Sequence, residues 1–173
     1  MPKFKDYPDF TPNLTPRQIF MMGSFIEWGG YWRPIYSSVV EKELSNQQKE
    51  FSFLKDLPEE FLINPSRDYK KLNKYGVKCG SSLADWEGKG WINPKDPYGW
   101  IQWYCRFYSG RRTPDDLRQI KRWLNIAGPN GRFRKMLINK INKVGTSFDD
   151  FNISPVIRQT LQHWGFKLTE KDL

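Results

Sequence analysis

The sequence predicts a mainly α-helical fold: a compact single domain of several short helices around a buried aromatic helix, with an irregular N-terminal half. Three observations lead to this fold class. The stretch 96–108 carries six aromatic residues within about three helical turns, and a helix that is apolar nearly all round is normally buried. Prolines and glycines mark the starts and ends of several further short helices. The chain shows no internal repeat and no clear strand periodicity, and 173 residues fit one domain of ordinary size.

The N-terminal half is expected to be irregular. Residues 1–15 alternate prolines with aromatic residues, which predicts an extended N-terminal arm, and the single helical domain would then span 16–173. A capped helix is predicted to start at Pro16 and to end near Ser24. The segment 25–40 is rich in glycine and aromatic residues and predicts a tightly packed loop. The charged segment 41–60 predicts a surface helix, alone or together with a loop.

The helices of the C-terminal half are easier to delimit. A short helix is expected within 81–90, followed by the aromatic helix, which starts after Asp96 and ends at Gly110. Three amphipathic helices follow, at about 114–127, 132–144 and 155–164. The residues expected to face the core are Leu117, Ile120, Trp123, Leu124 and Ala127 in the first of these, Phe133, Leu137, Ile141 and Val144 in the second, and Ile157, Leu161 and Trp164 in the last.

Charge is concentrated in one part of the chain. The formal net charge is +9, and the basic helical block 97–144 carries 11 Lys or Arg residues against 2 Asp or Glu. A localised basic block suggests a polyanionic partner, most often nucleic acid. The alternative is a basic, solvated surface that has no specific partner. No stretch approaches the roughly 20 apolar residues of a membrane span, and no apolar N-terminal signal region is present.

A pair of arginines follows the aromatic helix directly. Arg111 and Arg112 lie at the corner before the next helix, where two guanidiniums can hold phosphate oxygens in a bidentate manner. In the alternative interpretation they pair with Asp115 or Asp116 and only stabilise the corner. The helical hairpin 114–144 also resembles a helix-turn-helix in outline. The complete set of predicted phosphate-binding residues is Arg111, Arg112, Arg118, Lys121, Arg122, Arg132 and Lys135.

Signals for catalysis are weaker. His163 is the single histidine and lies off the apolar face of its helix, so a packing or capping role is favoured over a catalytic base. The chain shows no convincing Ser/His/Asp or Cys/His arrangement, and Cys105 is expected to be an inert core thiol. The loop 75–80 contains two glycines without a nucleotide-binding spacing, so a phosphate-cradling role is a minor alternative. We therefore expect no catalytic residue, metal or cofactor, while turnover stays an open question.

Paired aspartates offer one further alternative. Asp115 with Asp116, and Asp149 with Asp150, could in principle bind Mg²⁺ in a nuclease-like site. Helix-cap and loop roles explain both pairs more simply. We therefore predict that these four carboxylates serve local structure.

The run DPYGWIQWYCRF at 96–107 is followed by Gly110-Arg111-Arg112 and by RQI and RW at 118–120 and 122–123. Together these motifs resemble a family of small uncharacterised proteins found in cellular genomes and in large DNA viruses. The segments GVKCG at 76–80 and RQTLQHWG at 158–165 are similar to the flanking parts of the same family. The resemblance covers most of the chain from about Pro12. It implies one intact domain and carries no established activity or site.

The leading functional hypothesis is a nucleic-acid-binding, DNA-associated accessory protein that uses a basic helical surface. One alternative is a small enzyme acting on a phosphate-bearing or nucleic-acid substrate, with the arginine corner as the anion clamp. The other is a structural or assembly protein that contacts a protein partner through its arm. We expect an intracellular location, in cytoplasm or nucleus, and association with a virus particle is an open alternative. The sequence favours neither DNA nor RNA.

Overall fold

A computed structural model describes residues 1–63 and 68–173. It confirms the predicted fold class: a mainly helical compact domain with 44% helix, 4% strand and a large buried aromatic cluster. The α-helices in the described ranges are α1 (Pro16–Met21), α2 (Tyr69–Leu72), α3 (Leu83–Gly88), α4 (Trp100–Tyr108), α5 (Asp116–Ile126), α6 (Arg132–Val144) and α7 (Pro155–His163). No helix among these residues is long and apolar enough to cross a membrane.

Helix α4 forms the centre of the domain, as the sequence predicts. It begins at Trp100 and ends at Tyr108, and the side chains of Trp103, Tyr104 and Cys105 are completely buried. Gln102 of the same helix is also buried. Its side-chain oxygen accepts a hydrogen bond from the Tyr98 amide at 3.0 Å, so the buried amide group is satisfied and helps to start the helix.

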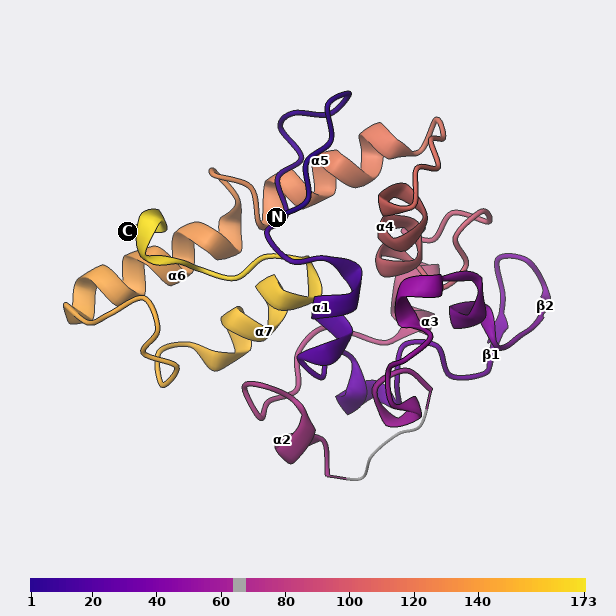
Figure 1. Ribbon diagram of the computed structural model, residues 1–173, viewed down its shortest axis with the longest axis horizontal. Coiled ribbons are helices and arrows are strands. Elements are labelled where there is room, and N and C mark those ends of the chain that lie inside the picture. Colours follow the sequence, from indigo (N-terminus) through magenta and orange to yellow (C-terminus); the bar gives the residue numbers. More distant parts are fainter. Residues whose placement is uncertain (64–67) are drawn as a thin grey trace.

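The N-terminal arm packs against α4. The ring of Phe10 lies edge-on to Tyr104, Phe107 and Trp123 with centroids between 5.2 and 5.7 Å apart. The hydroxyl of Tyr104 donates to the carbonyl of Leu14 at 2.8 Å. Figure 1 shows the first residues looping beside α5 before the chain enters α1. The arm therefore completes the aromatic core.

Two expectations for the N-terminal half are corrected. A small antiparallel hairpin is present, with β1 (Ile35–Ser37) paired to β2 (Lys42–Leu44) so that Ile35 lies opposite Leu44. Three-residue strands are too short to produce a recognisable alternation of apolar and polar residues, so no strand signal is visible in the sequence. The surface helix predicted for 41–60 is replaced by β2 and by the 3₁₀ turns Gln47–Glu50, Ser52–Leu54 and Glu59–Phe61.

Helices α5, α6 and α7 follow α4 and make up the C-terminal part of the molecule. Figure 1 shows α6 and α7 side by side and α5 leading into α6. Ile120, Trp123 and Leu137 are buried as predicted. Leu117 and Val144 are exposed instead, by 69% and 61%. They lie in the first turn of α5 and at the last position of α6, where the helices extend beyond the core.

Candidate functional site

A pocket of about 580 Å³ lies between the part of the chain up to the start of α4 and the helices α5 and α7. Its wall is built by the segment around 79–92, by the start of α4, by α5 and by the end of α7. Four tryptophans contribute to this wall, and we call the site the tryptophan pocket. These tryptophans are Trp86, Trp91, Trp100 and Trp164, and the polar members of the pocket include Ser81, Arg118, Arg122, Asn125, Thr160 and His163.

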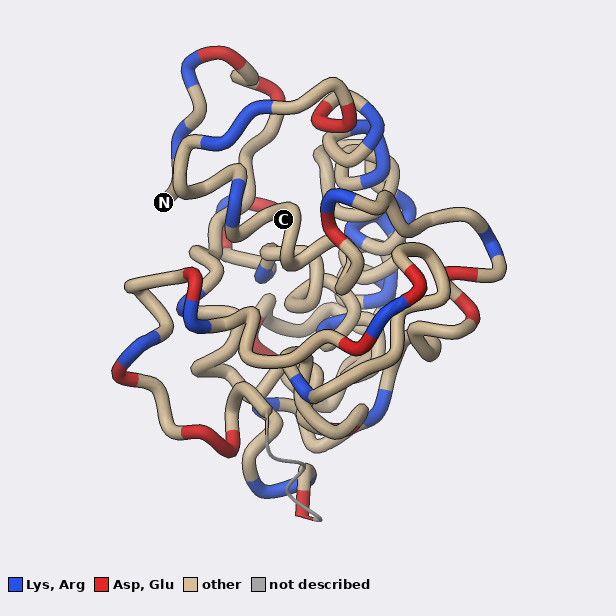
Figure 2. Tube along the Cα trace, turned by 90° about the vertical axis from the view of Figure 1, so that its right-hand side faces the viewer, with Lys and Arg blue, Asp and Glu red and all other residues tan. Residues whose placement is uncertain are grey.

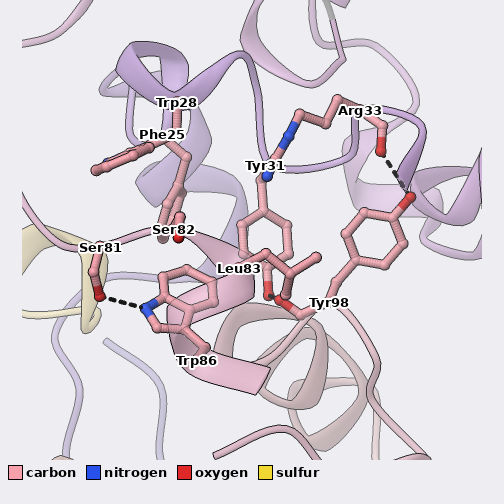
Figure 3. Close-up of a pocket in the computed structure, with 9 residues that line it drawn as sticks. All are labelled: Phe25, Trp28, Tyr31, Arg33, Ser81, Ser82, Leu83, Trp86 and Tyr98. Carbon is pink, nitrogen blue, oxygen red and sulfur yellow. Dashed lines mark hydrogen bonds between the residues drawn. The ribbon is translucent and has the colours of Figure 1, made fainter. Parts of the chain in front are cut away.

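Contacts within the chain fix the aromatic walls. The rings of Trp100 and Trp164 are packed with centroids 4.7 Å apart. The indole N–H of Trp86 donates to the Ser81 hydroxyl at 3.1 Å, as Figure 3 shows for the smaller cavity that shares both residues. Trp91 is 38% exposed. The indole N–H of Trp100 is buried and has no hydrogen-bond partner in the described ranges.

Arg122 is one of the cations that line this pocket. Its guanidinium lies 5.4 Å from the ring of Trp91 and 5.2 Å from that of Trp164. It donates to the side-chain oxygen of Gln119 at 3.0 Å and pairs with no carboxylate among the described residues. Burial lowers the pKa of Arg122 to about 10, with a further contribution from the nearby Arg118. The group is therefore cationic at neutral pH and held beside two aromatic faces.

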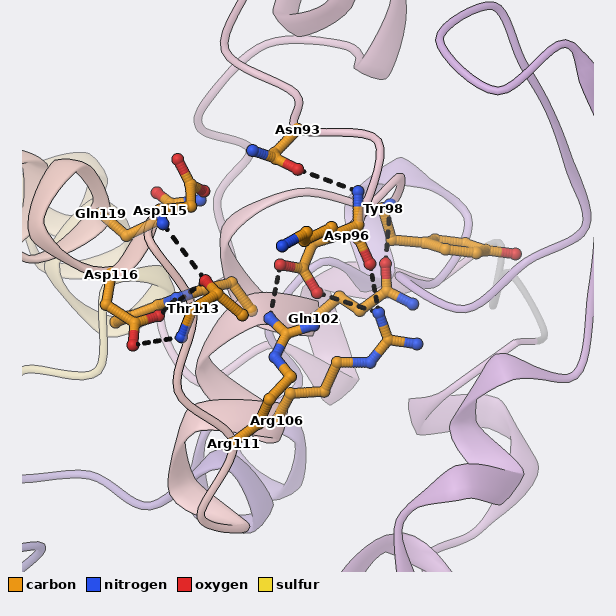
Figure 4. A network of polar contacts seen from close by, with 12 residues as sticks. Asn93, Asp96, Tyr98, Gln102, Arg106, Arg111, Thr113, Asp115, Asp116 and Gln119 are labelled. Carbon is orange, nitrogen blue, oxygen red and sulfur yellow. Dashed lines mark hydrogen bonds and ion pairs between the residues drawn. The ribbon is translucent and has the colours of Figure 1, made fainter.

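The predicted arginine corner is neutralised within the chain. Arg111 pairs with the buried Asp96 at 2.6 Å, and Arg112 pairs with Asp6 of the arm at 2.6 Å. Figure 4 shows Asp96 between Arg111 and Arg106. The alternative of internal pairing therefore describes the corner, but with Asp96 and Asp6 as the partners. In the view of Figure 2, acidic residues lie next to basic ones over much of the trace.

The other predicted residues divide into two groups. Arg118 pairs with Asp115 at 2.6 Å and, like Arg122, lines the tryptophan pocket. Lys121, Arg132 and Lys135 are exposed on α5 and α6, and none of them pairs with a carboxylate in the part of the chain described. The pocket thus brings together only two of the seven predicted residues, Arg118 and Arg122.

The aspartates have local partners. Asp116 accepts hydrogen bonds from the Thr113 amide and from the Trp103 indole, both at 2.8 Å. It therefore joins the start of α5 to the central helix α4. Asp150 accepts from the Thr146 hydroxyl at 3.0 Å, and Asp149 accepts from the Ser147 hydroxyl. These contacts fit the predicted structural roles of both pairs.

Three ionisable side chains, those of Glu27, Cys79 and His163, have polar atoms within 4.8 Å of one another, and Cys79 and His163 line the pocket. The Cys79 sulfur lies 3.7 Å from Nδ1 of His163, and a Glu27 oxygen lies 3.2 Å from Nε2. All three residues are at least nine-tenths buried. The imidazole stacks on Phe25 with centroids 4.0 Å apart. No Cys/His arrangement was expected from the sequence, and this cluster corrects that expectation.

The sequence does not reveal this cluster because its three members lie far apart along the chain. Glu27 belongs to the 3₁₀ helix Ile26–Trp28, Cys79 to a loop, and His163 to the last turn of α7. No local spacing connects them. Because a single histidine on a helix more often packs than reacts, its pattern alone gave no signal. The glycines of the loop 75–80 were visible in the sequence, but they pointed to phosphate binding.

The surroundings of His163 favour its protonated form. Burial alone would lower the pKa of His163, but the Cys79 sulfur and the Glu27 carboxylate outweigh it and raise the pKa to about 9. The second cysteine, Cys105, lies in the core. Burial raises the pKa of the Cys105 thiol well above its ordinary value, and this side chain has no exposed surface. The prediction that Cys105 belongs to the core is thus confirmed.

A measurable pH dependence follows for His163. Since its pKa rises from an ordinary 6.5 to about 9 on folding, its contribution to stability is complete below pH 6.5 and is lost as the pH rises through 9. We expect the free energy of unfolding to fall by up to about 3 kcal/mol over this interval. Urea unfolding at several pH values measures it. The fall should be much smaller in His163→Gln, and an equal fall in that variant would show that other groups cause it.

Comparison of the chain with protein-family models, with curated proteins and with solved structures found no match.

Proposed function

We propose that this protein is a nucleic-acid-binding accessory protein that takes one unpaired nucleotide into the tryptophan pocket. The base would stack on a tryptophan face, and Arg122 would hold the adjacent phosphate. Aromatic stacking combined with a nearby cation is the common chemistry of single-strand recognition. The proposal keeps the predicted partner and moves the site away from the arginine corner.

The guanidinium of Arg122 carries this proposal. A partly buried arginine commonly has a carboxylate partner, as Arg111, Arg112 and Arg118 do, and the buried Arg158 is instead satisfied by three backbone carbonyls. Arg122 has only a neutral amide, that of Gln119. Its position beside Trp91 therefore favours a ligand that supplies both an anion and a planar ring. A nucleotide has both.

The exposed cations on α5 and α6 would serve a second purpose. Lys121, Arg132 and Lys135 have no internal carboxylate among the described residues and remain available for solvent or ligand. They would contact the phosphates that flank the bound nucleotide. Contacts of this kind release counterions, so binding should weaken steeply as salt rises.

The experiment is a fluorescence-anisotropy titration with a labelled oligothymidine strand. We expect salt-dependent binding by the wild type and an affinity about tenfold weaker in Arg122→Gln, because a charge-assisted phosphate contact is lost. Arg112→Gln is the matched control and should bind almost normally, since Asp6 already occupies that guanidinium. An unlabelled duplex should compete poorly because its bases are paired.

Absence of binding at low salt would end the proposal. Equal losses in Arg112→Gln and Arg122→Gln would place the contact on a general basic surface instead. Unfolding midpoints of both variants, measured in the same buffer, separate lost binding from lost folding.

A further inference from the structure

We propose that Cys79, His163 and Glu27 form a covalent acyl-transfer site at the floor of the tryptophan pocket. Cys79 would be the nucleophile, His163 the general base and acid, and Glu27 the residue that positions the imidazole. The substrate class would be a carboxylic ester, thioester or amide whose remaining part fits the aromatic walls. This inference goes beyond the proposed nucleic-acid binding and does not require it.

Both ring nitrogens of His163 lie within 4.0 Å of the Cys79 sulfur, and Nε2 also lies beside the Glu27 carboxylate. Nδ1 is the ring atom closer to the sulfur, at 3.7 Å, and Nε2 is the one beside the Glu27 carboxylate, at 3.2 Å. This is the order nucleophile, base, orienting group that activated nucleophiles require. A single metal ion would need one nitrogen to face both other ligands. The nitrogen beside Glu27 is 4.0 Å from the sulfur, a separation that a shared metal ion would also allow, so the metal site is the competing arrangement that the test below separates.

Further contacts hold this arrangement in place. The other Glu27 oxygen accepts from the side-chain amide of Asn73 at 3.1 Å, which leaves the first oxygen for His163. The carbonyl of Cys79 accepts from the Trp28 indole at 2.7 Å, so the backbone that carries the thiol is fixed. The ring of Phe25 covers one face of the imidazole. The charged or titratable groups facing His163 are thus Cys79 and Glu27.

The loop after Cys79 offers donors for a developing negative charge. In the described part of the chain, the backbone N–H groups of Gly80 and Ser81 make no hydrogen bond. Both residues line the pocket beside the thiol. Gly80 has a φ of +81°, and a side chain there would meet only open space. Free amides next to a nucleophile can stabilise the oxyanion of a tetrahedral intermediate.

The reaction balances with water as the only co-reactant. The Cys79 sulfur, its proton held by His163, attacks the carbonyl carbon and forms a tetrahedral oxyanion. The carbonyl then re-forms, the bond to the leaving group breaks, and His163 gives its proton to that group. Water adds to the resulting thioester and passes a proton to His163. The carbon–sulfur bond breaks, which releases the acid and restores Cys79.

The test uses p-nitrophenyl acetate as the probe on the intact chain. We expect release of p-nitrophenol together with an acetyl group on Cys79, located by mass spectrometry of the digested protein. The acylation rate should fall about a hundredfold in His163→Gln, the scale of lost general-base catalysis. Cys105→Ala is the matched control and should react like the wild type, because that thiol is fully buried. Cys79→Ala and Cys79→Ser should both be inactive.

The positioning role of Glu27 is tested through the pKa of His163, which a purely structural role of Glu27 would leave unchanged. His163 is the single histidine, so its ring protons give one NMR titration curve. The wild-type midpoint should lie near 9, and Glu27→Gln should lower it. Acetylation of Cys105 instead of Cys79, or no acetylation of the folded protein, would overturn the proposal. So would stoichiometric Zn²⁺ that survives dialysis and is lost in Cys79→Ala, since it would identify a metal site.

Discussion

Replacement of Asp96 by Asn should destabilise the domain by about 3 kcal/mol. The Asp96 carboxylate is 1% exposed and pairs with Arg106 at 2.9 Å and with Arg111 at 2.6 Å. Asn has the same shape but no charge, so two partly buried guanidiniums lose a common counterion. Breaking a buried pair costs about 3–5 kcal/mol. We expect the lower end because Arg106 keeps Glu50 as a second partner at 2.7 Å. Urea denaturation measures the change.

Asp6→Asn provides the control for this prediction. It removes the same chemical group from the same kind of arginine pair, but the Asp6 side chain is 51% exposed. Solvent screens such pairs, so the unfolding midpoint should hardly move. Equal destabilisation by the two substitutions would show that burial of Asp96 does not set the strength of the network in Figure 4.

Replacement of Gly23 by Ala should have a comparable or larger effect, a loss of at least about 3 kcal/mol. Gly23 ends the first helical segment with a φ of +74°, which disfavours any residue with a side chain. An added Cβ would also lie 2.2 Å from the carbonyl oxygen of Leu72. The two backbone segments that meet here cannot easily move apart, because a hydrogen bond joins them: the amide of Lys74 donates to the carbonyl of Met22 at 3.0 Å. The contact cannot be relieved by rotating a side chain.

Gly145→Ala separates the two causes. Gly145 has the same φ of +74° at the end of α6, but a Cβ there would meet nothing within 4 Å. Only the backbone strain remains, and we expect a loss of about 1 kcal/mol. The comparison is made by thermal or urea unfolding of both variants. If Gly145→Ala were as damaging as Gly23→Ala, the close approach of α2 to the end of α1 would not be the cause.

Local signals in the sequence were sufficient for much of the fold. Proline at the first turn and glycine after the last located α7, and the density of aromatic residues identified α4 as the central helix. These features act over a few residues and are therefore readable from the chain alone. The hairpin was missed because its strands have three residues each.

The candidate site could be predicted only in part. The charge of Arg122 predicts a phosphate contact, but the sequence does not show that its neighbours are Trp91 and Trp164. The same charge argument applies to Arg111 and Arg112, whose carboxylate partners lie 15 and 106 residues away in the chain. Pairings over such distances depend on the folded packing. The same applies to Cys79 and His163, which are 84 residues apart.

We propose that the tryptophan pocket, rather than the arginine corner, receives the nucleic acid. An NMR titration of ¹⁵N-labelled protein with a short oligothymidine strand tests it most directly, through the indole and guanidinium N–H signals. We predict that the signals of Trp91, Trp100 and Arg122 shift together, while those of Arg111 and Arg112 stay in place. Shifts at Arg111 and Arg112 with unmoved pocket indoles would contradict the account.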